Sequence, residues 1–124
     1  ENLEFKLNVG FNLAPLRAAL PHNLTWKMRT YVNSKSYSDV QFDVQGTIIS
    51  AHKVILAARS PKFHAELLGQ FKESHAKVIT LEEVKPSAFL ALLEFIYTDD
   101  VKTIEDDDAV ELLTLANEYS LDKL

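Results

Sequence analysis

The 124-residue sequence contains no cysteine, which excludes disulfide bonds and thiolate metal sites. Only three glycines are present, Gly10, Gly46 and Gly69, and they are too far apart to form a phosphate-cradling loop. No apolar run approaches the roughly 18 residues that a membrane-spanning helix needs. The sequence therefore shows no disulfide framework, no phosphate loop and no membrane span.

Basic residues are in the minority, since 13 Lys and Arg stand against 18 Asp and Glu and give a net charge of -5. This balance argues against direct binding to the phosphate backbone of a nucleic acid. The hydrophobic fraction of 47% and the charged fraction of 25% are ordinary for a globular protein. At this length we expect one domain with one core, and no secretion signal is visible. We expect an intracellular protein, cytoplasmic or nuclear.

Neither the histidines nor the acidic run has the spacing of a metal or catalytic site. His22, His52, His64 and His75 lack the i, i+3 or i+4 partners that zinc motifs use. The run from Glu105 to Asp108 lacks the mid-loop glycine and terminal glutamate of a calcium loop, and is better explained as the start of a helix. No G-x-S-x-G motif is present. The sequence thus predicts no catalytic, metal or cofactor site.

The segment from Ser38 to Phe63 has the most informative sequence patterns of the chain. Apolar and polar residues alternate from Val40 to Val44, the pattern of a strand with one buried face. Gln45-Gly46 favours a tight turn, because glycine adopts positive φ without steric cost. Thr47 to Ile49 is predicted to be the returning strand of this hairpin.

The hairpin leads directly into helices. We expect a helix over Ala51 to Arg59, and Ser60 to cap a second helix that has Pro61 at its first position. A third strand is predicted from Lys77 to Leu81. Two further helices are predicted from their apolar stripes, one with Phe89, Leu92, Leu93 and Ile96, and one with Ala109, Leu112, Leu113 and Ala116. The fold class is α+β, a small sheet packed against a cluster of helices.

The N-terminal part is predicted to be an extension followed by a helix. Residues 1–22 form the extension, with a possible strand over Leu3 to Val9 and a short helix over Ala14 to Leu20. The domain then covers residues 23–124. Its first helix presents one apolar face, formed by Leu24, Met28, Tyr31 and Val32.

Five motifs together resemble the BTB/POZ domain family over Ser38 to Leu124. In order they are Ser38-Asp39-Val40, Gly46, Ala51-His52-Lys53, Leu56-Ala57-Ala58-Arg59-Ser60-Pro61 with Phe63, and Phe95-Ile96-Tyr97-Thr98-Asp99. The sequences of these motifs are most similar to those of MATH-BTB adaptors of ubiquitin ligases. The resemblance implies the BTB/POZ fold, and it implies that the chain stops before the last helix of the family.

The resemblance also implies site residues. A homodimer interface is expected at Leu24, Met28, Tyr31, Val32 and Ile55. Asp39 and Lys53 are expected to form a charge pair near the dimer floor, either as a stabilising ion pair, which we favour, or as part of a ligand-recruitment pocket. His52 matches a buried histidine whose role in the family is structural.

The loop before the third strand is the feature with most functional weight. Cullin-binding BTB domains carry a hydrophobic-x-Glu motif in this loop, and Phe71-Lys72-Glu73 matches it. We therefore expect Phe71, Lys72, Glu73 and Ser74 to contact a cullin. The alternative is that Phe71 folds back onto the helix from Phe63 to Leu68 as local core.

These features predict a self-associating interaction module that does no chemistry itself. It would recruit a cullin, the third paralogue by analogy with the family, as a substrate adaptor of a cullin-RING ubiquitin ligase. The alternative is a homodimerisation module of a transcriptional repressor or chromatin-associated protein that binds no cullin. A tetramerising channel-type BTB domain fits the His52-Lys53 and Arg59-Ser60-Pro61 wording least well. No nucleic acid or membrane partner is expected.

Overall fold

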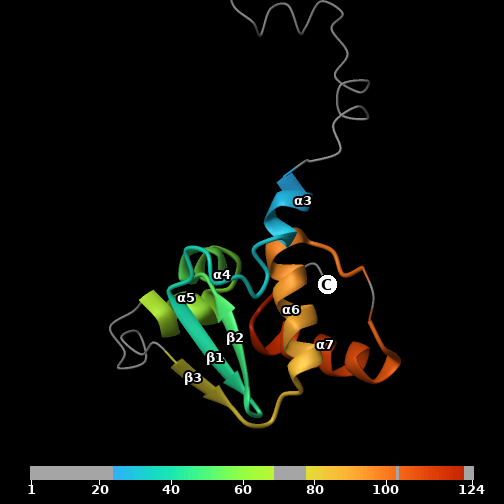
Figure 1. Cartoon of the computed structure of the whole chain (residues 1–124). Coiled ribbons are helices and arrows are strands. Elements are labelled where there is room, and N and C mark those ends of the chain that lie inside the picture. The colour runs from blue at the N-terminus through green and yellow to red at the C-terminus, as the bar shows by residue number, and fades with distance from the viewer. Residues whose placement is uncertain (1–23, 69–77, 103, 122–124) are drawn as a thin grey trace, which may run out of the picture.

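The computed structural model describes residues 24–68, 78–102 and 104–121. These residues form a three-stranded sheet and five helices, which confirms the α+β class (Figure 1). In this view α3 (Leu24–Arg29) stands at the top of the molecule, above α6 (Pro86–Thr98). The strand predicted over Leu3 to Val9 and the helix over Ala14 to Leu20 lie outside the described residues.

The sheet has the strand order β2-β1-β3. β1 (Val40–Val44) pairs antiparallel with β2 (Thr47–Ala51) and parallel with β3 (Val78–Leu81). Val40, Phe42 and Val44 are all buried, as their alternation with polar residues predicted. Among the described residues β1 is therefore the central strand, and β2 and β3 form the two edges.

The hairpin turn follows the expected chemistry. Gln45 and Gly46 have φ values of 52° and 91°, so both occupy the left-handed region that a two-residue hairpin turn needs. The Gly46 N–H donates to the Asp43 carboxylate at 2.9 Å. β2 then continues through Ala51, which pairs with Val40, instead of ending at Ile49. The helix predicted from Ala51 is α4 (Lys53–Arg59), which begins two residues later because Ala51 remains in the sheet.

Ser60 separates α4 from α5 (Pro61–Leu68) and caps α5 as predicted. Its hydroxyl oxygen accepts the Phe63 N–H at 3.1 Å and donates to the Tyr119 carbonyl at 2.7 Å. The side chain is fully buried, so both bonds form away from water. One serine thus begins α5 and holds the end of the last helix against it.

Aromatic rings join the sheet to the helices. Phe42 of β1 lies 5.9 Å from Phe63 of α5 and 4.8 Å from Phe89 of α6, between ring centroids. Phe63 in turn stacks on Tyr119 at 4.3 Å. The predicted stripe of α6 is confirmed, since Phe89, Leu92, Leu93 and Ile96 are all buried. Asp99 ends this helix in the left-handed conformation.

The stripe predicted for the last helix was partly wrong. In α7 (Asp106–Glu118) the buried residues are Asp108, Leu112, Leu115 and Ala116, whereas Leu113 is 58% exposed and Ala109 is half-buried. The helix is rotated so that Asp108 faces inward, where its carboxylate meets the Lys85 ammonium at 2.7 Å. Hydrogen bonds from Lys85 and Ser87 hold the pKa of Asp108 below its usual range.

The first helix is shorter than predicted. α3 ends at Arg29, and Tyr31 and Val32 lie in the following turns, whose N–H groups bond three residues back to Met28 and Arg29. Asn33 then adopts a left-handed φ of 54°, which prevents the helix from continuing. Met28, Tyr31 and Val32 nevertheless pack against the core.

Candidate protein-interaction surfaces

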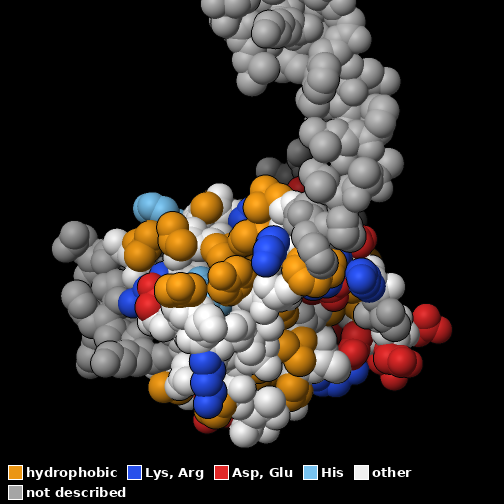
Figure 2. Space-filling model, turned by 45° about the horizontal axis from the view of Figure 1, so that its top comes forward, with side chains coloured by type: hydrophobic (Ala, Val, Ile, Leu, Met, Phe, Trp, Pro, Cys, Tyr) orange, Lys and Arg blue, Asp and Glu red, His pale blue; other side chains and the backbone are white. Residues whose placement is uncertain are grey.

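An exposed apolar face covers α3 and α4. α3 has no buried residue, and Leu24 and Trp26 are 75% and 40% exposed. Val54 of α4 is 70% exposed, and Tyr37, between α3 and β1, is 86% exposed. Figure 2 is turned so that the top of the molecule comes forward, and it shows hydrophobic side chains gathered across the upper part of the described surface. We use the term α3–α4 face for the exposed residues Leu24, Trp26, Tyr37 and Val54 together with the half-buried residues Met28, Tyr31, Val32 and Ile55.

The half-buried part of this face is the predicted interface set. Met28, Tyr31, Val32 and Ile55 are packed against the core and remain partly exposed. The Tyr31 ring meets the His52 ring edge-on at 5.7 Å, which brings the segment after α3 next to the start of α4. Four of the five predicted residues are thus half-buried against the core, while Leu24 is exposed.

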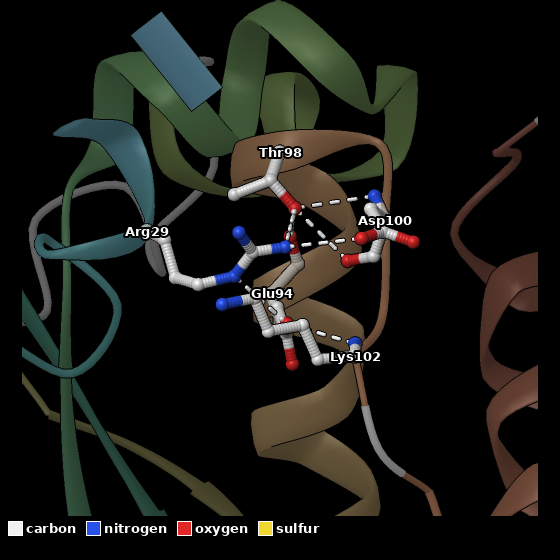
Figure 3. Close-up of polar contacts among 5 residues, drawn as sticks. All are labelled: Arg29, Glu94, Thr98, Asp100 and Lys102. Carbon is white, nitrogen blue, oxygen red and sulfur yellow. Dashed lines mark hydrogen bonds and ion pairs between the residues drawn. The ribbon is translucent and has the colours of Figure 1, made fainter. Parts of the chain in front are cut away.

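Arg29 fixes the base of α3 to α6 (Figure 3). Its Nε donates to the Glu94 carboxylate at 3.0 Å, and its Nη2 lies 3.3 Å from the Asp100 carboxylate and 3.4 Å from the Thr98 hydroxyl. The same Glu94 oxygen accepts the backbone N–H of Lys102 at 3.0 Å. The guanidinium therefore ties α3 both to α6 and to the segment that follows it.

We call this contact the Arg29 clamp; no pattern in the sequence predicts it. It comprises Arg29, Glu94, Thr98, Asp100 and Lys102. Arg29 and its partners are 65 to 71 residues apart in the chain. No local spacing signals such a pairing. The clamp matters for the α3–α4 face because it sets where the exposed helix stands on the domain.

His52 is buried directly beneath this face. Its Nε2 lies 2.7 Å from the Ser36 carbonyl, which only accepts, so Nε2 carries the proton. Nδ1 then accepts from the Tyr97 hydroxyl at 2.7 Å, and the same hydroxyl accepts the His52 backbone N–H at 3.0 Å. Burial raises the pKa of Tyr97 above its usual range, which keeps the phenol protonated as a donor. The backbone N–H and both ring nitrogens of His52 therefore have partners within the protein, which agrees with a structural role.

Asp39 caps α4. Its Oδ1 accepts the backbone N–H of Lys53 at 2.8 Å, and His52, the residue before the helix, provides no side-chain cap of its own. The two residues predicted as a charge pair are thus adjacent, joined by a carboxylate-to-backbone hydrogen bond. The side-chain charge pair between them stays a prediction.

The predicted cullin-binding residues, Phe71, Lys72, Glu73 and Ser74, lie outside the described residues. The described chain stops at the end of α5 and resumes at β3. Leu68 and Val78, the residues on either side of the gap, are 51% and 48% exposed. Large apolar side chains therefore stand at the surface at both ends of this segment.

The described residues contain neither a cluster of metal ligands nor a membrane-spanning helix. No group of three or more His, Cys, Asp or Glu residues in the described ranges could hold a metal ion. No helix among them is long and apolar enough to cross a membrane.

Comparison with known proteins agrees with this description. The family model for the BTB/POZ domain matches residues 28–124. BTB/POZ domain-containing protein 9 of Drosophila melanogaster is 40% identical over 93 residues, which cover 73% of this chain and 13% of that protein. BTB/POZ and MATH domain-containing protein 3 of Arabidopsis thaliana is 34% identical over 84 residues, 68% of this chain and 21% of its own length.

A third relative extends the match toward the N-terminus. TD and POZ domain-containing protein 2 of Mus musculus is 33% identical over 116 residues, covering 93% of this chain and 32% of that protein. The chain thus spans less than a third of each of these three relatives. The α+β fold, the five motifs and the family match all lead to one conclusion. This chain belongs to the BTB/POZ domain family, whose fold serves as a protein-interaction module.

Proposed function

We propose that this BTB/POZ domain self-associates through the α3–α4 face and recruits a cullin as the substrate adaptor of a cullin-RING ubiquitin ligase. The observation that carries self-association is the exposure of α3. Leu24 and Trp26 of this helix are 75% and 40% exposed, so two large apolar side chains stand at the surface of the described chain. A second copy would cover the same apolar side chains by two-fold symmetry.

Self-association predicts a dimer mass. Light scattering at tens of micromolar should give twice the mass of the chain, and the Leu24→Asp/Met28→Asp variant should give a monomer, because each carboxylate would be buried unpaired. Val110→Asp/Leu113→Asp is the matched control, since these apolar residues of α7 are 69% and 58% exposed on another helix. A monomeric parent, or equal effects of both variants, would contradict the assignment of this face.

Cullin recruitment rests on the sequence motif. Phe71-Lys72-Glu73 matches the hydrophobic-x-Glu motif of cullin-binding BTB domains, and the motif falls between α5 and β3, where those domains carry it. In this proposal Phe71 enters an apolar pocket of the cullin and Glu73 accepts hydrogen bonds there. The domain holds a substrate near the ligase, which raises the effective concentration of the substrate. An intracellular location, cytoplasmic or nuclear, is part of the proposal.

Calorimetric titration with the N-terminal domain of a cullin tests this proposal. A buried aromatic anchor is typically worth about 2–4 kcal/mol, so Phe71→Ala should weaken binding by at least about tenfold at an unchanged melting temperature. Leu68→Ala, an exposed apolar truncation at the end of α5, is the control and should bind as the parent does. A lowered melting temperature would instead indicate that Phe71 is local core. No measurable affinity in the parent would remove the adaptor function and favour a dimerisation module of a transcriptional regulator.

A further inference from the structure

The outer edge of β3 is open in the described part of the chain. The parallel register pairs Leu81 with Val44, and the Leu81 carbonyl accepts the Gln45 N–H at 3.2 Å. Because successive residues of a strand point their backbone groups to opposite sides, those of Val78 and Thr80 face away from β1. No described strand lies there (Figure 1). β3 therefore offers the N–H and C=O groups of two residues to an incoming strand.

The opposite edge of the sheet is blocked in part, at Ser50. The outward N–H of Ser50 in β2 donates to the Asn33 side chain at 2.9 Å, which lies in the connection between α3 and β1. Asn33 thus takes the place that a further strand would occupy. The two edges therefore differ in the described structure: one outward N–H of β2 is bonded within the chain, and none of the outward groups of β3 has such a bond among the described residues.

Two adjoining grooves run beside β3. One, of about 520 Å³, is lined by the apolar or aromatic residues Phe42, Ala65, Ile79, Leu81 and Tyr119, by Glu66, and by the ion pair of Lys62 with Glu118. The other, of about 680 Å³, shares Leu81, Glu118 and Tyr119 with it and adds Glu82, Glu83 and Glu111. An added strand would send alternate side chains into the first groove and place its ends over the second.

The charge beside this edge selects the partner. Glu111 accepts the backbone N–H of Lys85, and the Lys85 ammonium, which also lines this groove, lies 2.7 Å from the Asp108 carboxylate. Glu82 and Glu83 are exposed and make no ion pair with any residue that the structure describes. Two carboxylates at the end of an open strand favour lysine or arginine on the segment that pairs with it.

We propose that β3 accepts an extended, basic segment of a partner protein as a fourth strand of the sheet. Backbone hydrogen bonds to Val78 and Thr80 would supply affinity. An apolar side chain in the groove over Ile79 and Leu81, and a basic side chain on Glu82 and Glu83, would supply specificity. This surface is separate from the α3–α4 face and does not depend on cullin binding.

A short synthetic peptide in which lysine alternates with valine is the probe, and calorimetric titration of the whole chain is the measurement. Thr80→Pro removes the outward N–H without touching the bonds to β1, and should weaken binding about tenfold. Thr80→Val keeps that N–H and should bind as the parent does. Glu82→Gln/Glu83→Gln should weaken binding about threefold to tenfold, whereas Asp106→Asn/Asp107→Asn, equally acidic but on α7, should not.

A change in the peptide covers the case in which Thr80→Pro fails to fold. N-methylation of alternate peptide residues removes one row of donors and leaves the protein untouched, so it should abolish binding if a strand is added. Equal binding of the methylated and unmethylated peptides would show plain charge attraction and overturn the proposal. So would no binding of the parent at about 1 mM peptide. Light scattering and the cullin titration should be unaffected by these variants, which keeps this test distinct from the proposed function.

Discussion

Replacing Arg29 by alanine should loosen α3 from the domain more than any other single change on that helix. The Arg29 side chain is 21% exposed and Glu94 is 19% exposed, so their bond is partly shielded from water. A charge-assisted hydrogen bond of this kind contributes about 1.5–3 kcal/mol. The contact to Asp100, which is 63% exposed, adds less than about 1 kcal/mol. Arg29→Ala should therefore cost about 1–3 kcal/mol.

Urea unfolding of the parent and a few variants measures this cost. The free energy of unfolding of Arg29→Lys should lie between those of the parent and of Arg29→Ala. A lysine ammonium cannot reach Glu94, Thr98 and Asp100 together as the planar guanidinium does. Lys27→Ala is the control, an exposed basic residue of the same helix whose ammonium lies 5.4 Å from the Trp26 ring. A cycle with Glu94→Gln should show coupling of about 1 kcal/mol or more. If the free energies of unfolding of Arg29→Ala and Lys27→Ala agree within about 0.3 kcal/mol, the clamp does not stabilise the domain and the reasoning is refuted.

The remaining predictions concern two other carboxylates. Because hydrogen bonds from Lys85 and Ser87 lower the pKa of Asp108, its stabilising effect is complete above about pH 4 and is lost as the pH falls through the lowered value. In thermal melts, the difference in melting temperature between the parent and Asp108→Asn should therefore become smaller below about pH 4. A difference in melting temperature that does not change with pH would contradict this. Asp39→Ala should cost about 1 kcal/mol because it removes the cap of α4, and Asp39→Asn should cost less. A double-mutant cycle of Asp39→Ala with Lys53→Ala should show coupling, and none would mean that the predicted charge pair is absent.

Local signals predicted the elements whose structure is decided locally. The alternation from Val40 to Val44, the Gln45-Gly46 turn and the Ser60 cap each depend on neighbours a few residues away, and each was confirmed. The family motifs extended this to the whole fold. The BTB/POZ assignment could therefore be made before any coordinates were known.

Long-range contacts decided what local patterns did not predict. The sequence predicted both Leu112 and Leu113 of α7 in the core, but the packed helix buries Leu112, Leu115 and Ala116 and leaves Leu113 exposed. On the same buried face Asp108 meets Lys85, a residue 23 positions upstream. Ala51 stays in β2 because it pairs with Val40 across the hairpin. The Arg29 clamp joins residues more than 60 positions apart. Such pairs come together only in the folded structure, so local spacing in the sequence cannot predict them.

Sedimentation velocity on an equimolar mixture of this chain and a cullin N-terminal domain tests the central claim most directly. Self-association through the α3–α4 face and one cullin on each copy predict a single fast species that contains two copies of each protein. The Leu24→Asp/Met28→Asp variant should reduce that species to one copy of each. Two proteins that sediment separately would contradict cullin recruitment, and a one-to-one complex of the parent chain would contradict self-association.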